Sequence, residues 1–88
     1  MIRRDYQILS PDGIHARPAT ALIRLVRTFK STVQIGKGEQ MVRLTSMLNI
    51  LTLSAKGGDT LTAVIEGEDE QQAAEILDHF FQHQLKEL

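Results

Sequence analysis

The segment 13–20 (Gly-Ile-His-Ala-Arg-Pro-Ala-Thr) constrains the fold more than any other, because it joins an extended stretch to a helix. Residues 2–9 alternate imperfectly between apolar and polar side chains, which predicts a strand, and a turn-forming cluster follows them. Pro18 suits a first helical turn, since its ring holds φ near the helical value and its missing N–H is not needed there. We therefore predict that a helix begins at about Ala16, with His15 at the N-cap or just before it.

The position predicted for His15 gives its imidazole a particular electrostatic environment. Unpaired backbone N–H groups and the positive end of the helix dipole point outward there and disfavour a cationic ring. An imidazole nitrogen that is neutral at neutral pH can act as a nucleophile. If the ring acquires a phosphoryl group, the same N–H groups and the guanidinium of Arg17 can hold its oxygens. The alternative is that His15 is a polar surface residue without a role.

The helix predicted from Ala16 to Arg27 or Thr28 is amphipathic. Its apolar positions follow helical spacing and are Ala19, Leu22, Ile23 and Val26. The opposite side carries Arg17, Thr20, Ala21, Arg24 and Arg27. This basic stripe is either a solvated helix face or a surface that binds a partner. Because residues 13–38 contain no acidic side chain, we favour a surface for an acidic protein partner.

The length and composition predict one domain, spanning residues 1–88, with a single core. The chain has no cysteine, so packing must stabilise the fold, which fits a cytoplasmic protein. Its first residues lack the apolar region of a signal peptide, and no stretch is apolar for the length of a membrane span. We therefore expect neither secretion nor membrane insertion.

The net charge of −1 conceals an uneven distribution along the chain. Residues 13–58 carry a net charge of +6, and residues 59–88 carry −7. Such a chain lacks the strongly basic surface that neutralises nucleic-acid phosphates, so we expect no direct binding to nucleic acid. A basic half that contains His15 suits binding to acidic protein surfaces and to phosphate.

The middle of the chain predicts a β-hairpin and a short helix. Strands over residues 32–35 and 40–44 flank a loop of Gly36, Lys37 and Gly38. Ser46 is a good N-cap for a helix that begins at Met47. Four aliphatic side chains follow, Leu48, Ile50, Leu51 and Leu53, and they cannot all point inward, so we predict that part of this run is exposed. An exposed aliphatic patch beside a basic surface would be a site for binding a protein. The alternative, which the residues alone favour, is that the run belongs to the core.

The last third predicts a strand over residues 60–66, in which alternate side chains are apolar, after a turn at 57–59. Asp69 and Gln72 have the spacing of a capping box at the start of a final helix. The apolar stripe of that helix is Ala73, Ile76, Leu77, Phe80 and Phe81. The order β-α-β-β-α-β-α implies a two-layer domain with helices packed on a sheet, but periodicity does not give the order of the strands.

Three stretches together resemble a known family. The segment 13–20, the run Val42-Arg43-Leu44-Thr45-Ser46 and the sequence Gly67-Glu68-Asp69-Glu70 ahead of the final helix are similar to the HPr-like family, the histidine-containing phosphocarriers of the bacterial phosphoenolpyruvate–sugar phosphotransferase system. The spacings match over nearly all 88 residues. The resemblance implies an α+β open-faced β-sandwich, with a four-stranded antiparallel sheet in the order 1-4-2-3 and three helices on one face.

The resemblance also implies a function. His15 would accept a phosphoryl group on Nδ1 from phospho-enzyme I and pass it to enzyme II A domains, with Arg17 stabilising the phosphate. The partner-binding residues would be Thr20, Arg24, Arg27, Met47, Leu48 and Leu51. Such a protein is a stoichiometric carrier, not an enzyme, and needs no metal or cofactor. The alternative is a regulatory HPr paralogue that signals nitrogen status or catabolite repression through its phosphorylation state.

Ser46 is a candidate regulatory site by the same resemblance. In Gram-positive members a serine here is phosphorylated by HPr kinase/phosphorylase, which slows transfer at the histidine and creates a co-repressor for a catabolite-control transcription regulator. Thr45 stands where a basic residue is usual, and Asn49 stands where kinase-regulated members have glycine. The alternative is a plain capping serine.

His79 and His83 have the i, i+4 spacing that can bind a metal ion on a helix. Two histidines without a third ligand are more often polar surface residues, so we predict no metal site.

Overall fold

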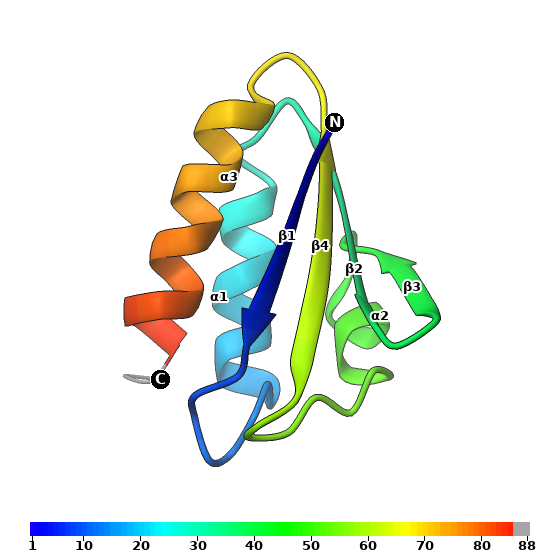
Figure 1. Cartoon of the computed structure of the whole chain (residues 1–88), viewed down its shortest axis with the longest axis vertical. Coiled ribbons are helices and arrows are strands. Elements are labelled where there is room, and N and C mark those ends of the chain that lie inside the picture. Colours follow the sequence, from blue (N-terminus) through cyan, green and yellow to red (C-terminus); the bar gives the residue numbers. More distant parts are fainter. Residues whose placement is uncertain (86–88) are drawn as a thin grey trace.

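The computed structural model describes residues 1–85 and contains a four-stranded antiparallel sheet with its helices on one face (Figure 1). The elements in chain order are β1 (Ile2–Gln7), α1 (Ala16–Val26), β2 (Thr32–Lys37), β3 (Gln40–Arg43), α2 (Met47–Leu51), β4 (Thr60–Glu66), α3 (Glu70–His79) and a π-helical continuation, η1 (Phe80–Gln84). The strand order is β1-β4-β2-β3. The α+β architecture and the strand order implied by the family resemblance are therefore confirmed.

Strand β4 is one of the two inner strands of the sheet and pairs with β1 and β2. Ile65 lies opposite Ile2 on one side and opposite Val33 on the other. The predicted alternation holds, since Leu61, Ala63 and Ile65 are fully buried while the residues between them lie on the open face. This buried row forms the floor on which the helices pack.

Helices α1 and α3 cover the sheet with their apolar faces (Figure 1). The buried residues of α1 are Pro18, Ala19, Leu22, Ile23 and Val26, and those of α3 are Ala73, Ala74 and Leu77. The helical spacing of apolar residues thus identified the inner face of α1. In α3 it missed Ala74, which is buried, and included Ile76, which is half-buried. Burying a side chain such as Leu22 or Leu77 contributes about 2 kcal/mol to stability.

The predicted hairpin loop of Gly36, Lys37 and Gly38 is wrong in its position. Gly36 and Lys37 belong to β2, and Lys37 pairs with Gln40, so the turn consists of Gly38 and Glu39. Gly36 is needed inside the strand because a Cβ there would lie 2.0 Å from the Met41 sulfur and 2.5 Å from the Gln40 carbonyl oxygen. A glycine inside a strand often marks such a close approach.

The predicted capping box of Asp69 and Gln72 is also wrong. Asp69 is the N-cap residue of α3, but its side chain makes no capping hydrogen bond. Its carboxylate instead accepts hydrogen bonds from the Lys30 and Ser31 main-chain N–H groups, both at 2.9 Å, and from the Ser31 hydroxyl. The side chain therefore links the start of α3 to the segment between α1 and β2.

Several element ends differ from the predictions. Helix α1 ends at Val26 rather than at Arg27 or Thr28, and β3 ends at Arg43 rather than at residue 44. Strand β1 ends at Gln7 rather than at residue 9, and Leu9 is exposed while Ile8 is buried and bonded through its N–H to the Asp59 carbonyl at 2.8 Å. The final helix becomes π-helical at Phe80. In the part of the chain that is described, no helix combines the length and the apolar character that a membrane span requires.

Candidate functional site

The loop before α1 is held by backbone contacts that fix the position of His15. Gly13 has a φ of +67°, and a Cβ at this residue would lie 2.1 Å from the Ala55 carbonyl oxygen. The next residue, Ile14, is buried and donates its N–H to the same carbonyl at 3.0 Å. Glycine is required here because only it tolerates both the left-handed backbone and the close approach. Contacts with Ala55 therefore hold Gly13 and Ile14, the two residues before His15, in place.

His15 is the N-cap residue of α1, as the position of Pro18 predicts. Its backbone is extended, with φ −97° and ψ −168°, and its carbonyl accepts the first helical hydrogen bond from the Ala19 N–H at 3.0 Å. Its half-buried side chain makes no capping hydrogen bond. The N–H groups of Ala16 and Arg17 lie in the first turn, where an α-helix offers no acceptor. Two main-chain donors are thus available at the helix start beside the imidazole.

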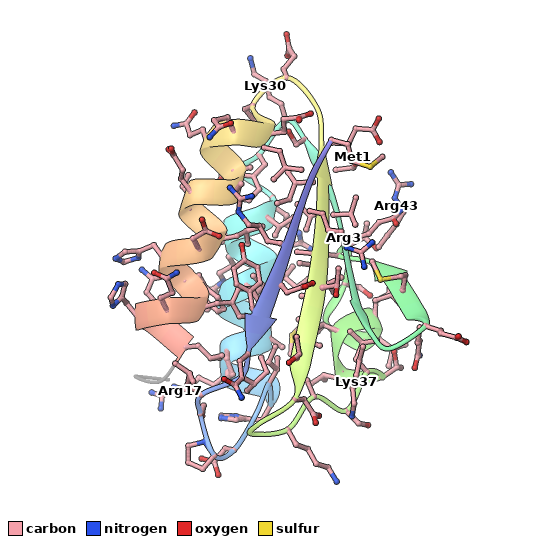
Figure 2. The ribbon with its side chains drawn as sticks, viewed as in Figure 1. Met1, Arg3, Arg17, Lys30, Lys37 and Arg43 are labelled. Atoms are coloured by element: carbon pink, nitrogen blue, oxygen red, sulfur yellow. The ribbon has the colours of Figure 1, made fainter. Side chains whose placement is uncertain are left out.

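Arg17 is exposed in the first turn of the same helix. Figure 2 shows it at the end of the molecule where α1 begins. Its guanidinium forms no ion pair with any carboxylate of residues 1–85, and the first turn of α1 holds no acidic residue. The guanidinium is therefore available to an anion at the helix start.

A hollow of about 280 Å³ separates α1 from α2 and brings together five of the predicted residues. It is lined by Thr20, Ile23, Arg24, Arg27, Ser46 and Met47. Thr20 connects the two helices, since its hydroxyl donates to the Ala16 carbonyl at 2.8 Å and lies 3.2 Å from the Met47 sulfur. Ile23 was assigned only to the core by periodicity, and it is the member of this surface that sequence reasoning missed.

The aliphatic side chains of α2 and of Leu53, two residues after it, are divided between the core and the surface. Ile50 is fully buried and Leu53 is 3% exposed, whereas Leu48 is 70% and Leu51 is 36% exposed. The prediction that part of this run is exposed is confirmed. Leu48 and Leu51 do not line the hollow between α1 and α2, but they lie on the same short helix as Met47.

Ser46 is the N-cap residue of α2, as predicted. Its hydroxyl oxygen accepts a long hydrogen bond of 3.4 Å from the Asn49 N–H. The Asn49 side-chain amide donates to the Arg43 carbonyl at 2.9 Å and to the Thr45 hydroxyl at 3.2 Å. Asn49 therefore stabilises the turn before α2, a role that sequence reasoning missed. The only signal for it was an amide side chain close to a polar turn.

His79 and His83 lie at the junction of α3 and η1, with ring centroids 5.0 Å apart. Among residues 1–85, no group of three or more histidine, cysteine, aspartate or glutamate side chains is placed to hold a metal ion.

Comparison with known proteins places the chain in a family. The model of the family described as "PTS HPr component phosphorylation site" matches residues 2–83. The phosphocarrier protein HPr of Lysinibacillus sphaericus is 38% identical over 77 residues, which cover 88% of each chain. The HPr-like protein Crh of Halalkalibacterium halodurans is 30% identical over 82 residues, which cover 93% of this chain and 98% of the relative.

The three-dimensional comparison agrees with the sequence comparison. The crystal structure of HPr-C-His from Thermoanaerobacter tengcongensis superposes with a TM-score of 0.91 at 26% identity, over 97% of this chain and 96% of that one. The fold and the matching residues define a phosphocarrier-type domain. The chain belongs to the HPr family of the phosphotransferase system.

Proposed function

We propose that this chain is a phosphocarrier of the phosphotransferase system and that His15 is the residue that carries the phosphoryl group. The observation that supports the assignment to His15 is its place as the N-cap residue of α1, with the first-turn N–H groups and Arg17 beside it, in a member of the HPr family. The partners are enzyme I as donor and enzyme II A domains as acceptors. The absence of cysteine fits work in a reducing cytoplasm.

The transfer step needs no general base. The lone pair of the neutral imidazole at Nδ1 attacks the phosphorus atom carried by the donor, and the bond between phosphorus and the donor nitrogen breaks as the new P–N bond forms. The other ring nitrogen keeps its proton, so no proton moves. Arg17 and the first-turn N–H groups neutralise the charge on the three equatorial oxygens during transfer. The reverse step delivers the group to the next acceptor.

Partner binding uses the surface next to this site. Arg24 and Arg27 line the hollow between α1 and α2 and form no ion pair within residues 1–85, so both are available to acidic side chains of a partner. Leu48 and Leu51 add exposed aliphatic area on α2. A basic groove beside an apolar patch combines electrostatic steering with a contact that excludes water.

Ser46 is the proposed regulatory site, because it lies in the same hollow. A phosphate on this hydroxyl would place negative charge beside Arg24 and Arg27 and oppose an acidic partner. Incubation with ATP and HPr kinase/phosphorylase, followed by mass spectrometry, tests this. Phosphate on Ser46 supports regulation, whereas an unmodified Ser46 leaves it as a plain capping residue.

The carrier function is tested by following phosphate from phosphoenolpyruvate through enzyme I to an enzyme II A domain. We expect phosphorylation of that domain only when this chain is present, with complete loss in His15→Ala and full activity in His79→Ala, which removes an exposed histidine of α3. If this chain accepts phosphate but passes it to no enzyme II A domain, the regulatory role suggested by its similarity to Crh replaces the carrier role.

A further inference from the structure

A second hollow, of about 240 Å³, lies at the other end of α1 from His15. It is enclosed by the end of α1, the first residues of β2 and the chain that leaves β3. The eleven residues of α1 place it about 16 Å along the helix axis from the N-cap. Figure 2 likewise shows Arg43, which lines this hollow, well separated from Arg17. The hollow is therefore distinct from the phosphoryl site, although it shares Arg27 with the hollow between α1 and α2.

The wall of this hollow combines an apolar floor with positive charge. Val26, Val33 and Leu44 line it and are almost fully buried. Arg27 and Arg43 also line it, and neither forms an ion pair with a carboxylate in the described part of the chain. None of the residues that line the hollow is acidic, although the Asp69 carboxylate is bonded to Ser31 in its wall. An apolar pocket with a few convergent polar groups is the usual form of a small-molecule site.

Thr45 adds a hydroxyl donor at the same wall. Its oxygen accepts the Asn49 side-chain amide at 3.2 Å, so the hydroxyl proton is not used in that bond. The nearby carboxylate of Asp69 is occupied by Lys30 and Ser31 N–H groups. Two of the last carbonyl groups of α1 are also occupied, since Leu25 accepts from the Thr28 N–H at 3.1 Å and Val26 accepts from the Phe29 N–H at 3.0 Å. These bonds reduce the negative potential that a helix end would otherwise present to an anion.

We propose that this hollow binds a small organic phosphate monoester, with the phosphate held by Arg27, Arg43 and Thr45 and a compact apolar body on the Val26, Val33 and Leu44 floor. Guanidinium groups match the oxygens of phosphate with paired hydrogen bonds. The volume lies below the range of about 300–1,000 Å³ that drug-sized ligands occupy, so the ligand is smaller than a nucleotide. This inference does not depend on the carrier function.

The test is a titration of the isotopically labelled full chain followed by two-dimensional amide NMR. The probes are phenyl phosphate, inorganic phosphate and phenol. We expect phenyl phosphate to shift the Val33, Leu44 and Thr45 amide signals saturably, with a dissociation constant of about a millimolar, as the size of the probe allows. Arg43→Gln and Arg27→Gln should each weaken binding by about tenfold. Arg3→Gln removes the same charge from β1, outside the hollow, and should leave binding unchanged.

Each other outcome contradicts the proposal. If phenyl phosphate shifts only the Ala16 and Arg17 amides, the anion binds at the start of α1 instead. If inorganic phosphate binds as tightly as phenyl phosphate, the apolar residues contribute nothing to the affinity. If phenol binds as tightly as phenyl phosphate, the arginines contribute nothing. The two arginine variants lie on different elements, so loss of folding in one leaves the other to decide. None of these signals requires phosphoryl transfer, which keeps the result separate from that of the carrier assay.

Discussion

The Asp69 carboxylate accepts hydrogen bonds from both the main-chain N–H and the hydroxyl of Ser31, which lies 38 residues earlier in the chain. A Cβ at Gly67 would lie 2.6 Å from the Ser31 hydroxyl oxygen, so the chain before α3 approaches the same residue closely. These contacts fasten the start of α3 to the segment that follows α1. Both helices that cover the sheet are thereby joined at one end of the molecule.

Asp69 gives the protein an acid-sensitive contribution to stability. The Ser31 hydroxyl, followed by the Lys30 N–H, holds the pKa of this carboxyl below its ordinary value of 3.8. A lowered native pKa stabilises the fold above the unfolded pKa, and the contribution is lost as the pH falls through the native pKa. We therefore expect the difference in urea midpoint between wild type and Asp69→Asn to be largest near neutral pH and to shrink below pH 3.8. The pKa values of Asp59 and Glu70 are also lowered. Both residues are present in wild type and in Asp69→Asn, so their contributions cancel in the difference between the two midpoints. A difference that does not change with pH would exclude the ionised carboxylate as its cause.

Tyr6 should resist ionisation for as long as the protein is folded. Burial, then the hydrogen bond to Asp78 at 2.6 Å and the charge of that carboxylate, raise the pKa of the phenol far above its ordinary value of 10.0. A raised native pKa means that this stability is present below pH 10.0 and is lost as the pH rises further. Tyr6 is the only tyrosine and the chain has no tryptophan, so the ultraviolet absorbance band of the phenolate reports this side chain alone. We expect ionisation to coincide with alkaline unfolding followed by circular dichroism. Ionisation of the folded protein near pH 10.0 would show that the phenol is not protected.

Tyr6→Phe isolates the hydrogen bond from the packing. The variant keeps the ring stacked on Phe81, where the centroids are 4.3 Å apart, and loses only the bond to Asp78. Because Arg4 also lies 3.5 Å from the Asp78 carboxylate, the acceptor keeps a partner. We expect a loss of about 1–2 kcal/mol in the free energy of unfolding, measured with urea. A variant as stable as wild type would mean that the hydrogen bond between β1 and α3 adds nothing to the stacking of Tyr6 on Phe81 of η1.

Leu48 and Ile50 form a matched pair for separating docking from stability. Leu48 is 70% exposed and Ile50 is fully buried, although they are two residues apart on α2. Leu48→Ala should change the free energy of unfolding by less than about 0.5 kcal/mol and weaken binding to enzyme I. Ile50→Ala should cost about 2–5 kcal/mol of stability. Calorimetric titration with enzyme I and urea unfolding measure the two effects. Unchanged affinity in Leu48→Ala would exclude Leu48 from the proposed docking surface.

Arg17 is expected to act on the rate of phosphoryl transfer. Arg17→Gln removes the guanidinium at the helix start without breaking any ion pair of residues 1–85, so the fold should be unaffected. We expect transfer from enzyme I, measured by rapid quench, to slow by at least about tenfold. Arg3→Gln makes the same charge change on an exposed residue of β1 and should transfer at the wild-type rate. If both variants slow transfer equally, Arg17 acts only through the overall positive charge of the protein and not through contact with the phosphate.

The elements of this fold were predictable because their signals are local. Pro18 fixed the start of α1, the period of two identified the buried face of β4, and Ser46 marked the start of α2. The strand order came from the family resemblance, because periodicity shows which face of a strand is buried and not which strand lies beside it. What failed depends on contacts between elements, which the periodicity of a single element does not reveal. The Gly36 backbone is covered by Met41, and the Asp69 carboxylate bonds to Ser31 instead of capping its own helix.

In the candidate site, too, the features with local signals were predictable, and those that depend on packing between elements were not. The position of His15 at a helix start followed from the residues beside it. The hollow that joins Thr20, Arg24 and Arg27 to Met47 did not, because it depends on how α2 packs against α1. The role of Asn49 was hidden for a related reason, since its two acceptors form a turn that the sequence alone does not define.

Direct detection of phosphate on the His15 ring tests the central claim most closely. After incubation with phosphoenolpyruvate and enzyme I, we expect a single acid-labile phosphate, located on His15 by mass spectrometry at alkaline pH and on Nδ1 by nitrogen NMR. His15→Ala should carry none, while His79→Ala and His83→Ala should be labelled like wild type. Phosphate on another residue, or equal labelling of His15→Ala, would contradict the account.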